Sequence, residues 1–137
     1  TVCLVSGHTH LPVLGRRIDQ DGIEYISIRY GTPINLEPGC YLINPGSVGQ
    51  PRDGDPRASY AILDTEAHTI VFNRREYDIE KTCNALGQES NGSEHPQEYT
   101  SLQERLRTGY GGEHMQYYHK EVYMKREFDL VAEKKNQ

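Results

Sequence analysis

Alternating apolar and polar positions predict that the first part of this chain is rich in β-strands. Residues 2–6 form a short continuous apolar run, which is typical of a central strand buried on both faces. Asp-Gly before residue 23 predicts a hairpin. Many Gly and Pro residues in 31–39 and 44–56 predict loops. The remaining predicted strands are residues 12–18, 22–30, 40–43, 57–64 and 69–77.

After residue 77 the apolar period changes from two to three or four, which predicts two helices. Asp78 is a natural N-cap and Gly87 a natural stop for the first helix. The second helix is expected at residues 97–107, with Gly109 ending it. The sequence therefore predicts an α/β fold that is β-rich in residues 1–77 and helical after residue 78.

The C-terminal residues differ in composition from the rest of the chain. Residues 1–112 are expected to form a domain, and residues 113–137 to be a polar, tyrosine-rich tail or a peripheral helix. Tyrosines on such a marginal helix more often pack on the parent domain than form an aromatic binding surface. The tyrosines concerned are Tyr110, Tyr117, Tyr118 and Tyr123.

Composition excludes several classes of protein for these 137 residues. Unbroken apolar runs are four residues or fewer, too short for a transmembrane helix, and no signal peptide opens the sequence. A net charge of −5 argues against broad binding to nucleic acid or to an anionic membrane. Three widely spaced cysteines without a CxxC pair are typical of reduced thiols, so a cytoplasmic location is expected.

A histidine pair directly follows the first predicted strand, in Gly7-His8-Thr9-His10. Functional side chains of α/β proteins gather at the carboxyl ends of strands, where the sheet fixes the backbone. Imidazoles at positions i and i+2 point the same way in extended backbone, and in a loop they can converge on one site or on two adjacent metals. His8 and His10 are therefore candidate metal ligands, with solvated or core histidines as the alternative.

A second candidate site is the segment Ile43-Asn44-Pro45-Gly46-Ser47 and the residues that follow it. A strand that runs into Asn-Pro-Gly-Ser makes a tight turn that offers N–H groups and a hydroxyl to an anion. Arg52 and Arg57 flank the next turn, and arginine is suited to bidentate contact with phosphate. The alternative is that Asp53 or Asp55 pairs with these arginines to order the loop. The candidate substrate-binding residues are Asn44, Ser47, Arg52 and Arg57.

Together the two segments resemble a known family. Gly7-His8-Thr9-His10-Leu11-Pro12, followed by residues 43–61, is similar to the C-terminal portion of a calcineurin-like metallophosphoesterase. The resemblance is to the bacterial group of YfcE and diadenosine-tetraphosphatase-like proteins, and it extends over residues 1 to about 112. The long Asn-Pro-Gly-Ser segment is its most specific part.

The resemblance implies a fold, a cofactor and a reaction. The fold of the family is a pair of mixed β-sheets between helices, with a two-metal site at the strand ends. His8 would bind one divalent ion and His10 the other, the ions being Mn, Fe, Ni, Zn or Mg. Two such ions activate a water for in-line attack on a phosphate monoester or diester.

The earlier metal-binding motifs of the family do not occur in this sequence. It has no Asp-x-His and no Gly-Asn-His, and its Gly54-Asp55 lies downstream of the histidine pair. Two imidazoles without carboxylates hold divalent ions poorly against water. We therefore predict that this chain needs the N-terminal half of the domain as its partner. Alone, it is expected to bind metal weakly and to hydrolyse nothing.

Two alternatives stay open on the sequence. A structural zinc site could use Cys3, His8, His10 and Cys40, although Cys3 in mid-strand is expected to point into the core. The chain could also be a non-catalytic β-rich module for partner binding or homo-oligomerisation, built on the same fold, with the histidines as relics.

Overall fold

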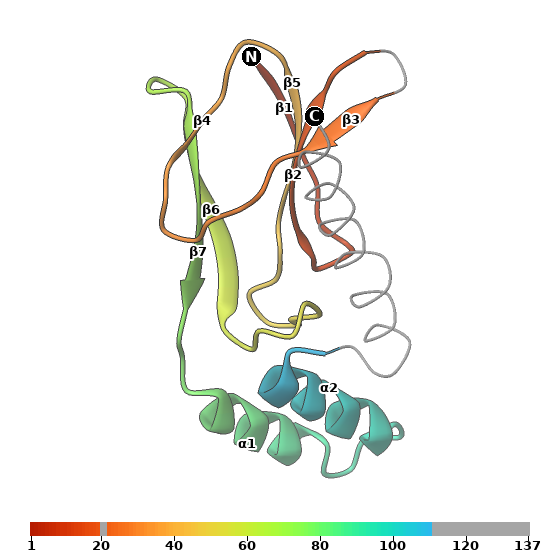
Figure 1. Ribbon diagram of the computed structural model, residues 1–137. Coiled ribbons are helices and arrows are strands. Elements are labelled where there is room, and N and C mark those ends of the chain that lie inside the picture. The colour runs from red at the N-terminus through yellow and green to blue at the C-terminus, as the bar shows by residue number, and fades with distance from the viewer. Residues whose placement is uncertain (20–21, 111–137) are drawn as a thin grey trace, which may run out of the picture.

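The structure is a computed structural model that describes residues 1–19 and 22–110. A four-stranded sheet has the order β1 (Val2–Val5), β5 (Cys40–Pro45), β2 (Pro12–Arg17) and β3 (Ile23–Tyr25). A three-stranded sheet has the order β4 (Ile34–Asn35), β7 (Thr69–Arg75) and β6 (Ala58–Asp64). The sheets stand side by side, and the helices α1 (Ile79–Glu89) and α2 (Pro96–Thr108) lie beyond one end of them (Figure 1). The predicted α/β fold, β-rich to residue 77 and helical after residue 78, is confirmed.

The core lies between the two sheets. Alternation along the strands points one set of side chains inward, and the register puts Leu14 of β2 opposite Ile43 of β5. Ile70 and Phe72 of β7 meet them from the other sheet, and both are fully buried. Burying each large apolar side chain stabilises the fold by about 1.5–3 kcal/mol. The core cluster comprises Leu14, Leu36, Tyr41, Ile43, Ile70 and Phe72.

Strand β1 exists as predicted, but the described residues do not bury it on both faces. Among the described residues it is an edge strand, paired in parallel with β5 alone. Val2 and Leu4 are each 65% exposed and Val5 is 61% exposed. Cys3 packs against the core cluster, as expected for its mid-strand position. A short apolar run identifies a strand here, but not its place in the sheet.

Two further predicted boundaries are wrong. The third strand ends at Tyr25 and not at residue 30, because the chain leaves the sheet there and packs Ile26 and Ile28 against the core. The predicted loop 31–39 contains the short strand β4, in which Ile34 pairs with Ile70 of β7.

The helix ends follow the capping signals with one exception. Asp78 caps α1 by accepting a hydrogen bond from the Lys81 amide, and α2 ends at Gly109 with φ 77°. Helix α1 does not stop at Gly87 but continues to Glu89 with Ser90 as its C-cap. Gln103 of α2 donates a side-chain hydrogen bond of 2.6 Å to the Cys83 carbonyl, which ties the two helices together.

No helix among the described residues is both long enough and apolar enough to cross a membrane. The predicted tail, residues 113–137, lies outside the described residues, and so do Tyr117, Tyr118 and Tyr123. The domain boundary at residue 112 stays a prediction.

Candidate functional site

The two sequence motifs meet at one edge of the four-stranded sheet. Strands β1 and β5 are parallel, so their carboxyl ends lie side by side. The Ser6 amide extends this pairing with a 2.9 Å hydrogen bond to the Ile43 carbonyl. The histidine pair follows β1 and the loop of residues 46–57 follows β5, at the end of the sheet that faces the helices (Figure 1).

Asn44 joins the two motifs. Its amide nitrogen donates to the Gly7 carbonyl at 3.1 Å and to Thr9 Oγ1 at 2.9 Å. Its amide oxygen accepts from the Gly46 amide at 3.0 Å. The residue is only 4% exposed, so both ends of the side chain serve the scaffold of the site. Its predicted contact with substrate stays a prediction.

The histidines lie in a strained turn. His8 and His10 both have left-handed backbone, with φ of 71° and 63°. The rule that side chains at i and i+2 point the same way in extended backbone therefore does not apply to them. Residues other than glycine adopt this conformation at a cost, and such strain clusters at functional sites. His8 is exposed, and no hydrogen bond joins its ring to the described residues.

His10 has a defined partner. Its Nδ1 lies 2.7 Å from the Gln50 carbonyl, and a carbonyl only accepts hydrogen bonds. Nδ1 therefore carries a proton, and in the neutral ring Nε2 has a free lone pair. Histidines that bind metals commonly have this arrangement, with one ring nitrogen donating to a carbonyl and the other bound to the ion.

The turn after β5 is held by serines. Ser47 Oγ accepts from the Gln50 amide at 2.9 Å, and Ser59 Oγ donates to the Pro45 carbonyl at 2.7 Å. Gly46 has φ 89°, and a Cβ atom there would meet Ser59 Oγ at 2.7 Å. Only glycine fits this position, which fixes the direction in which the loop leaves β5.

The two arginines predicted to bind substrate differ in their surroundings. Arg57 makes a bidentate contact with Asp55, at 2.9 Å from Nε and 2.6 Å from Nη2. This is the loop-ordering pairing that the sequence left open as the alternative. Arg52 is half-buried, and its Nε is buried without a hydrogen-bond partner among the described residues.

Arg74 is a site residue that sequence reasoning missed. It lies on β7, and its side chain is only 3% exposed. It forms an ion pair with Asp53 and donates a 2.8 Å hydrogen bond to the Tyr30 hydroxyl. The alternation of residues along β7 could have predicted its inward orientation, because Arg74 shares a face with Ile70 and Phe72. An arginine on a core-facing row needs a buried partner.

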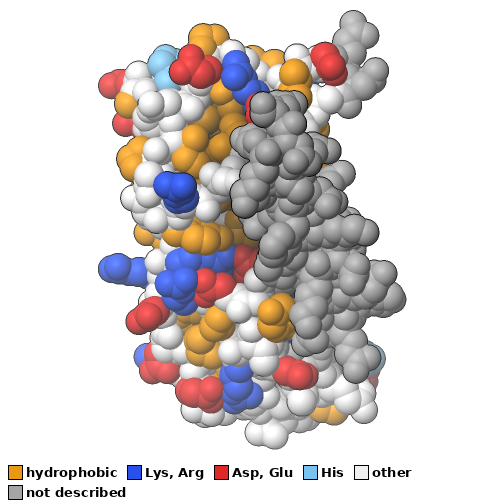
Figure 2. All heavy atoms as spheres, in the orientation of Figure 1, with side chains coloured by type: hydrophobic (Ala, Val, Ile, Leu, Met, Phe, Trp, Pro, Cys, Tyr) orange, Lys and Arg blue, Asp and Glu red, His pale blue; other side chains and the backbone are white. Residues whose placement is uncertain are grey.

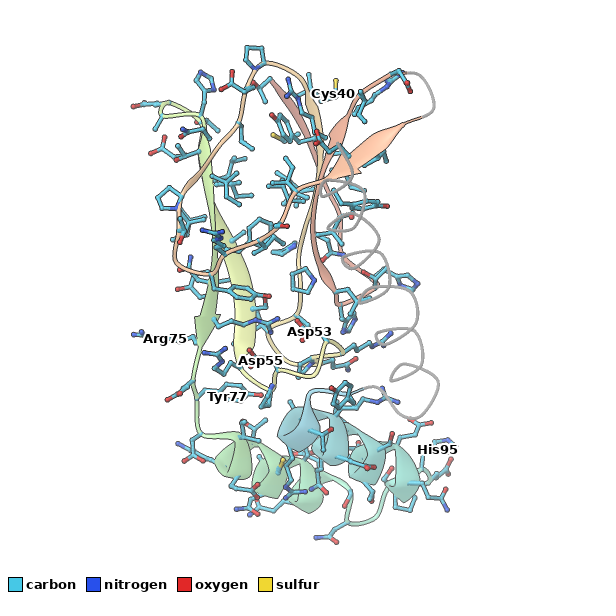
Figure 3. The ribbon with its side chains drawn as sticks, in the orientation of Figure 1. Cys40, Asp53, Asp55, Arg75, Tyr77 and His95 are labelled. Atoms are coloured by element: carbon cyan, nitrogen blue, oxygen red, sulfur yellow. The ribbon has the colours of Figure 1, made fainter. Side chains whose placement is uncertain are left out.

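Charges of both signs alternate in this part of the molecule. Hydrogen bonds from Arg57 hold the pKa of Asp55 below its ordinary value, although partial burial opposes them. Burial works against the charge of Arg74, yet hydrogen bonds with Asp53 and Tyr30 raise its pKa above the ordinary value. Figure 2 shows a band of basic and acidic side chains at the height where Figure 3 labels Asp53 and Asp55.

The described residues do not by themselves form a metal site. Within residues 1–19 and 22–110, no three His, Cys, Asp or Glu side chains come together in a way that could hold an ion. The zinc alternative with Cys3, His8, His10 and Cys40 is therefore wrong for this structure. Cys40 lies at the opposite end of the sheet from Asp53 and Asp55 (Figure 3).

Known proteins resemble this chain. The family model of the "Calcineurin-like phosphoesterase superfamily domain" matches residues 1–68. A curated relative, "Uncharacterized protein MJ0912" of Methanocaldococcus jannaschii, is 43% identical over 79 residues, which are 55% of this chain and 29% of that protein. A solved structure, a metallophosphoesterase from Sphaerobacter thermophilus, matches with a TM-score of 0.62 and 39% identity over 80% of this chain and 42% of that one. The chain thus spans less than half the length of either.

Proposed function

We propose, from the match of residues 1–68 to the calcineurin-like phosphoesterase family model, that the chain contributes to a metal-dependent phosphoesterase site. The substrate would be a phosphate monoester or diester. The fold and the structural likeness to a metallophosphoesterase support the proposal. The observation that carries it is the contact between His10 Nδ1 and the Gln50 carbonyl, which orients the ring and, in its neutral form, leaves the Nε2 lone pair to a ligand.

His8 and His10 would hold the divalent ions, His10 through Nε2. Bound ions would lower the pKa of a water and supply the nucleophile. The left-handed turn fixes where the two rings project, and Asn44 holds that turn against the loop after β5. Since the described residues offer too few ligands for an ion, the remaining donors would come from outside them. We expect these donors to come from the N-terminal half of the domain, which the sequence predicts as the partner of this chain.

The loop after β5 would face the phosphate. Ser47 Oγ already accepts from the Gln50 amide, so its own proton is available to a phosphate oxygen. The guanidinium of Arg52 has no ion pair or hydrogen bond with the described residues, which makes it a better candidate for substrate contact than Arg57. Arg57 is held by Asp55 and would have to give up that pair to reach an anion.

Manganese titration of the purified chain tests the ligand assignment. Mn²⁺ is paramagnetic, so its approach broadens the NMR signals of the ligands. We expect the ring signals of His8 and His10 to broaden at lower Mn²⁺ than those of His68, an exposed turn histidine that serves as internal control. His10→Ala should weaken the broadening of His8, and His68→Ala should not. Equal broadening of all three rings would refute the assignment.

Turnover tests the need for further donors. We expect the chain with Mn²⁺ to hydrolyse bis-p-nitrophenyl phosphate no faster than buffer with Mn²⁺. Steady turnover by the wild-type chain would contradict the prediction that the chain alone lacks metal ligands. If that turnover is lost in His10→Ala, His10 is supported as a metal ligand.

A second function is favoured by the exposed edge of the sheet. An unpaired apolar edge strand is a ready template for another chain, and β1 exposes Val2, Leu4 and Val5. The chain would then be a non-catalytic module for partner binding or homo-oligomerisation. Sedimentation separates the two, because Leu4→Lys should shift a self-associating wild type towards monomer. A monomeric wild type would remove the homo-oligomeric form of this alternative.

A further inference from the structure

The buried guanidinium of Arg74 contacts several groups of the loop after β5. Besides Asp53, its guanidinium lies 3.7 Å from the Asp55 carboxylate. It also lies within hydrogen-bond distance of two carbonyls in the loop, 3.2 Å from Arg57 O and 3.5 Å from Asp55 O. The loop runs from β5 of the four-stranded sheet to β6 of the three-stranded sheet, and Arg74 lies on β7 beside β6, so this side chain fixes the loop to the three-stranded sheet.

Tyr30 also contacts the guanidinium of Arg74. The guanidinium carbon lies 4.8 Å from the centre of the Tyr30 ring, in cation–π contact, while Nη2 donates to the hydroxyl. Burial is the main cause of the raised pKa of Tyr30, so the phenol stays neutral and accepts this hydrogen bond. A lysine could not make these contacts together, because it has a single nitrogen and no planar fork of donors.

A short segment, residues 50–53, connects the Arg74–Asp53 ion pair with His10. Asp53 is three residues from Gln50, whose carbonyl accepts the hydrogen bond from His10 Nδ1. Pro51 between them is fully buried, and the Gln50 amide is fixed by Ser47 Oγ. Beyond Asp53, the Gly54 amide donates to the Gly109 carbonyl at the end of α2. The Gln50 carbonyl is thus held from both sides, by Ser47 before it and by the ion pair after it.

We propose that Arg74 is a positioning residue for His10: through Asp53 it holds the Gln50 carbonyl in place and so keeps the His10 ring in the tautomer with a free Nε2. The functional value of this positioning rests on the proposed function, because only a metal ligand or a proton-transfer group needs Nε2 free. The structural link itself is measurable in the chain without metal or substrate.

Nitrogen NMR of the histidine rings is the test. At about pH 8 an ordinary imidazole is neutral, and ¹⁵N shifts then report which ring nitrogen carries the proton. In the wild-type chain we expect the Nδ1–H form of His10. In Arg74→Lys and in Asp53→Asn we expect the ratio of Nδ1–H to Nε2–H to fall roughly two- to tenfold, the range that corresponds to one net hydrogen bond.

Arg75→Lys is the matched control, because Arg75 is the exposed neighbour on the same strand and its side chain makes no hydrogen bond or ion pair with the described residues. We expect His10 in Arg75→Lys to keep the wild-type shifts, and His68 to be unchanged in every variant. If Arg74→Lys does not fold, as judged by circular dichroism, Asp53→Asn decides, since it removes the carboxylate charge and leaves the arginine in place.

The outcomes separate this inference from the proposed function. An unchanged His10 tautomer in folded Arg74→Lys and Asp53→Asn would overturn it, even where both variants lose stability, because a merely structural role does not move the tautomer. A shifted tautomer together with no preferential Mn²⁺ broadening of His10 would support the positioning link and refute the metal site.

Discussion

The side-chain amide nitrogen of Asn44 lies 2.9 Å from Thr9 Oγ1, and this contact joins the Gly-His-Thr-His segment to the Asn-Pro-Gly-Ser segment. The residues are 35 positions apart along the chain. They meet because β1 and β5 are parallel neighbours whose ends face the same way.

Asn44→Ala is expected to destabilise the chain by about 1–3 kcal/mol, because it leaves the Gly7 carbonyl and the Gly46 amide without their buried partner. Urea unfolding followed by circular dichroism measures the loss. Asn73→Ala is the control, since Asn73 is half-buried and its amide makes a single hydrogen bond of 3.3 Å to the nearby Val71 carbonyl. Equal losses in the two variants would mean that Asn44 does not join the motifs in solution.

Gly46→Ala is expected to cost more than Gly49→Ala, and the comparison tests the turn after β5. Gly46 has φ 89° and no room for a Cβ atom beside Ser59, whereas a Cβ atom at Gly49 meets nothing within 4 Å. Left-handed backbone alone costs a residue other than glycine roughly 1–2 kcal/mol, and the close contact adds to it. The unfolding midpoint in urea should therefore fall clearly for Gly46→Ala and little for Gly49→Ala.

A reversal of that order would show that the turn has a different backbone conformation. Addition of Ser59→Ala to Gly46→Ala provides a further check, because it removes the Oγ atom that the new Cβ would meet at 2.7 Å. Part of the lost stability should return, unless the cost of losing the Ser59 hydrogen bond to the Pro45 carbonyl is larger.

Features that depend only on residues near one another in the sequence could be predicted. Strands β6 and β7 follow from alternation around a short turn, and Asp78 and Gly109 mark helix ends because capping depends on the nearest residues. The Asn-Pro-Gly-Ser segment was located correctly because Gly and Pro restrict the backbone wherever they stand. The histidine pair and this segment could be placed at the ends of two strands because each of them directly follows a predicted strand.

Features that depend on the packing of distant residues could not be predicted. The pairing of Arg74 with Asp53 joins a residue of β7 to a loop residue 21 positions away, and nothing near Asp53 in the sequence distinguishes Arg74 from Arg52 or Arg57 as its partner. The edge position of β1 depends on which strand lies beside it, which its own four apolar residues do not encode. The tautomer of His10 depends on a carbonyl 40 positions away.

The ion pair of Asp55 with Arg57 is expected to make part of the stability depend on acid pH. Hydrogen bonds from Arg57 lower the pKa of Asp55 below the ordinary 3.8 of an aspartate, against a smaller opposing effect of burial. A lowered folded-state pKa adds stability that is fully present above the ordinary pKa and is lost as the pH falls through the folded-state value. Arg57 and Asp55 side chains are 45% and 25% exposed, so water screens the pair and the contribution is small.

Urea unfolding at about pH 5 and about pH 3, values on either side of the ordinary aspartate pKa, measures this contribution. We expect the midpoint of the wild-type chain to fall further between the two pH values than that of Asp55→Asn, and about 1 M NaCl to narrow the gap by screening the pair. Asp64→Asn is the matched control, because Asp64 accepts hydrogen bonds from the backbone amides of Glu66 and Ala67 in the β6–β7 turn. It keeps Asp55 and should keep the wild-type acid sensitivity. An Asp55→Asn chain that loses as much stability in acid as the wild type would show that the pair does not form in solution, which would leave Arg57 available to an anionic substrate.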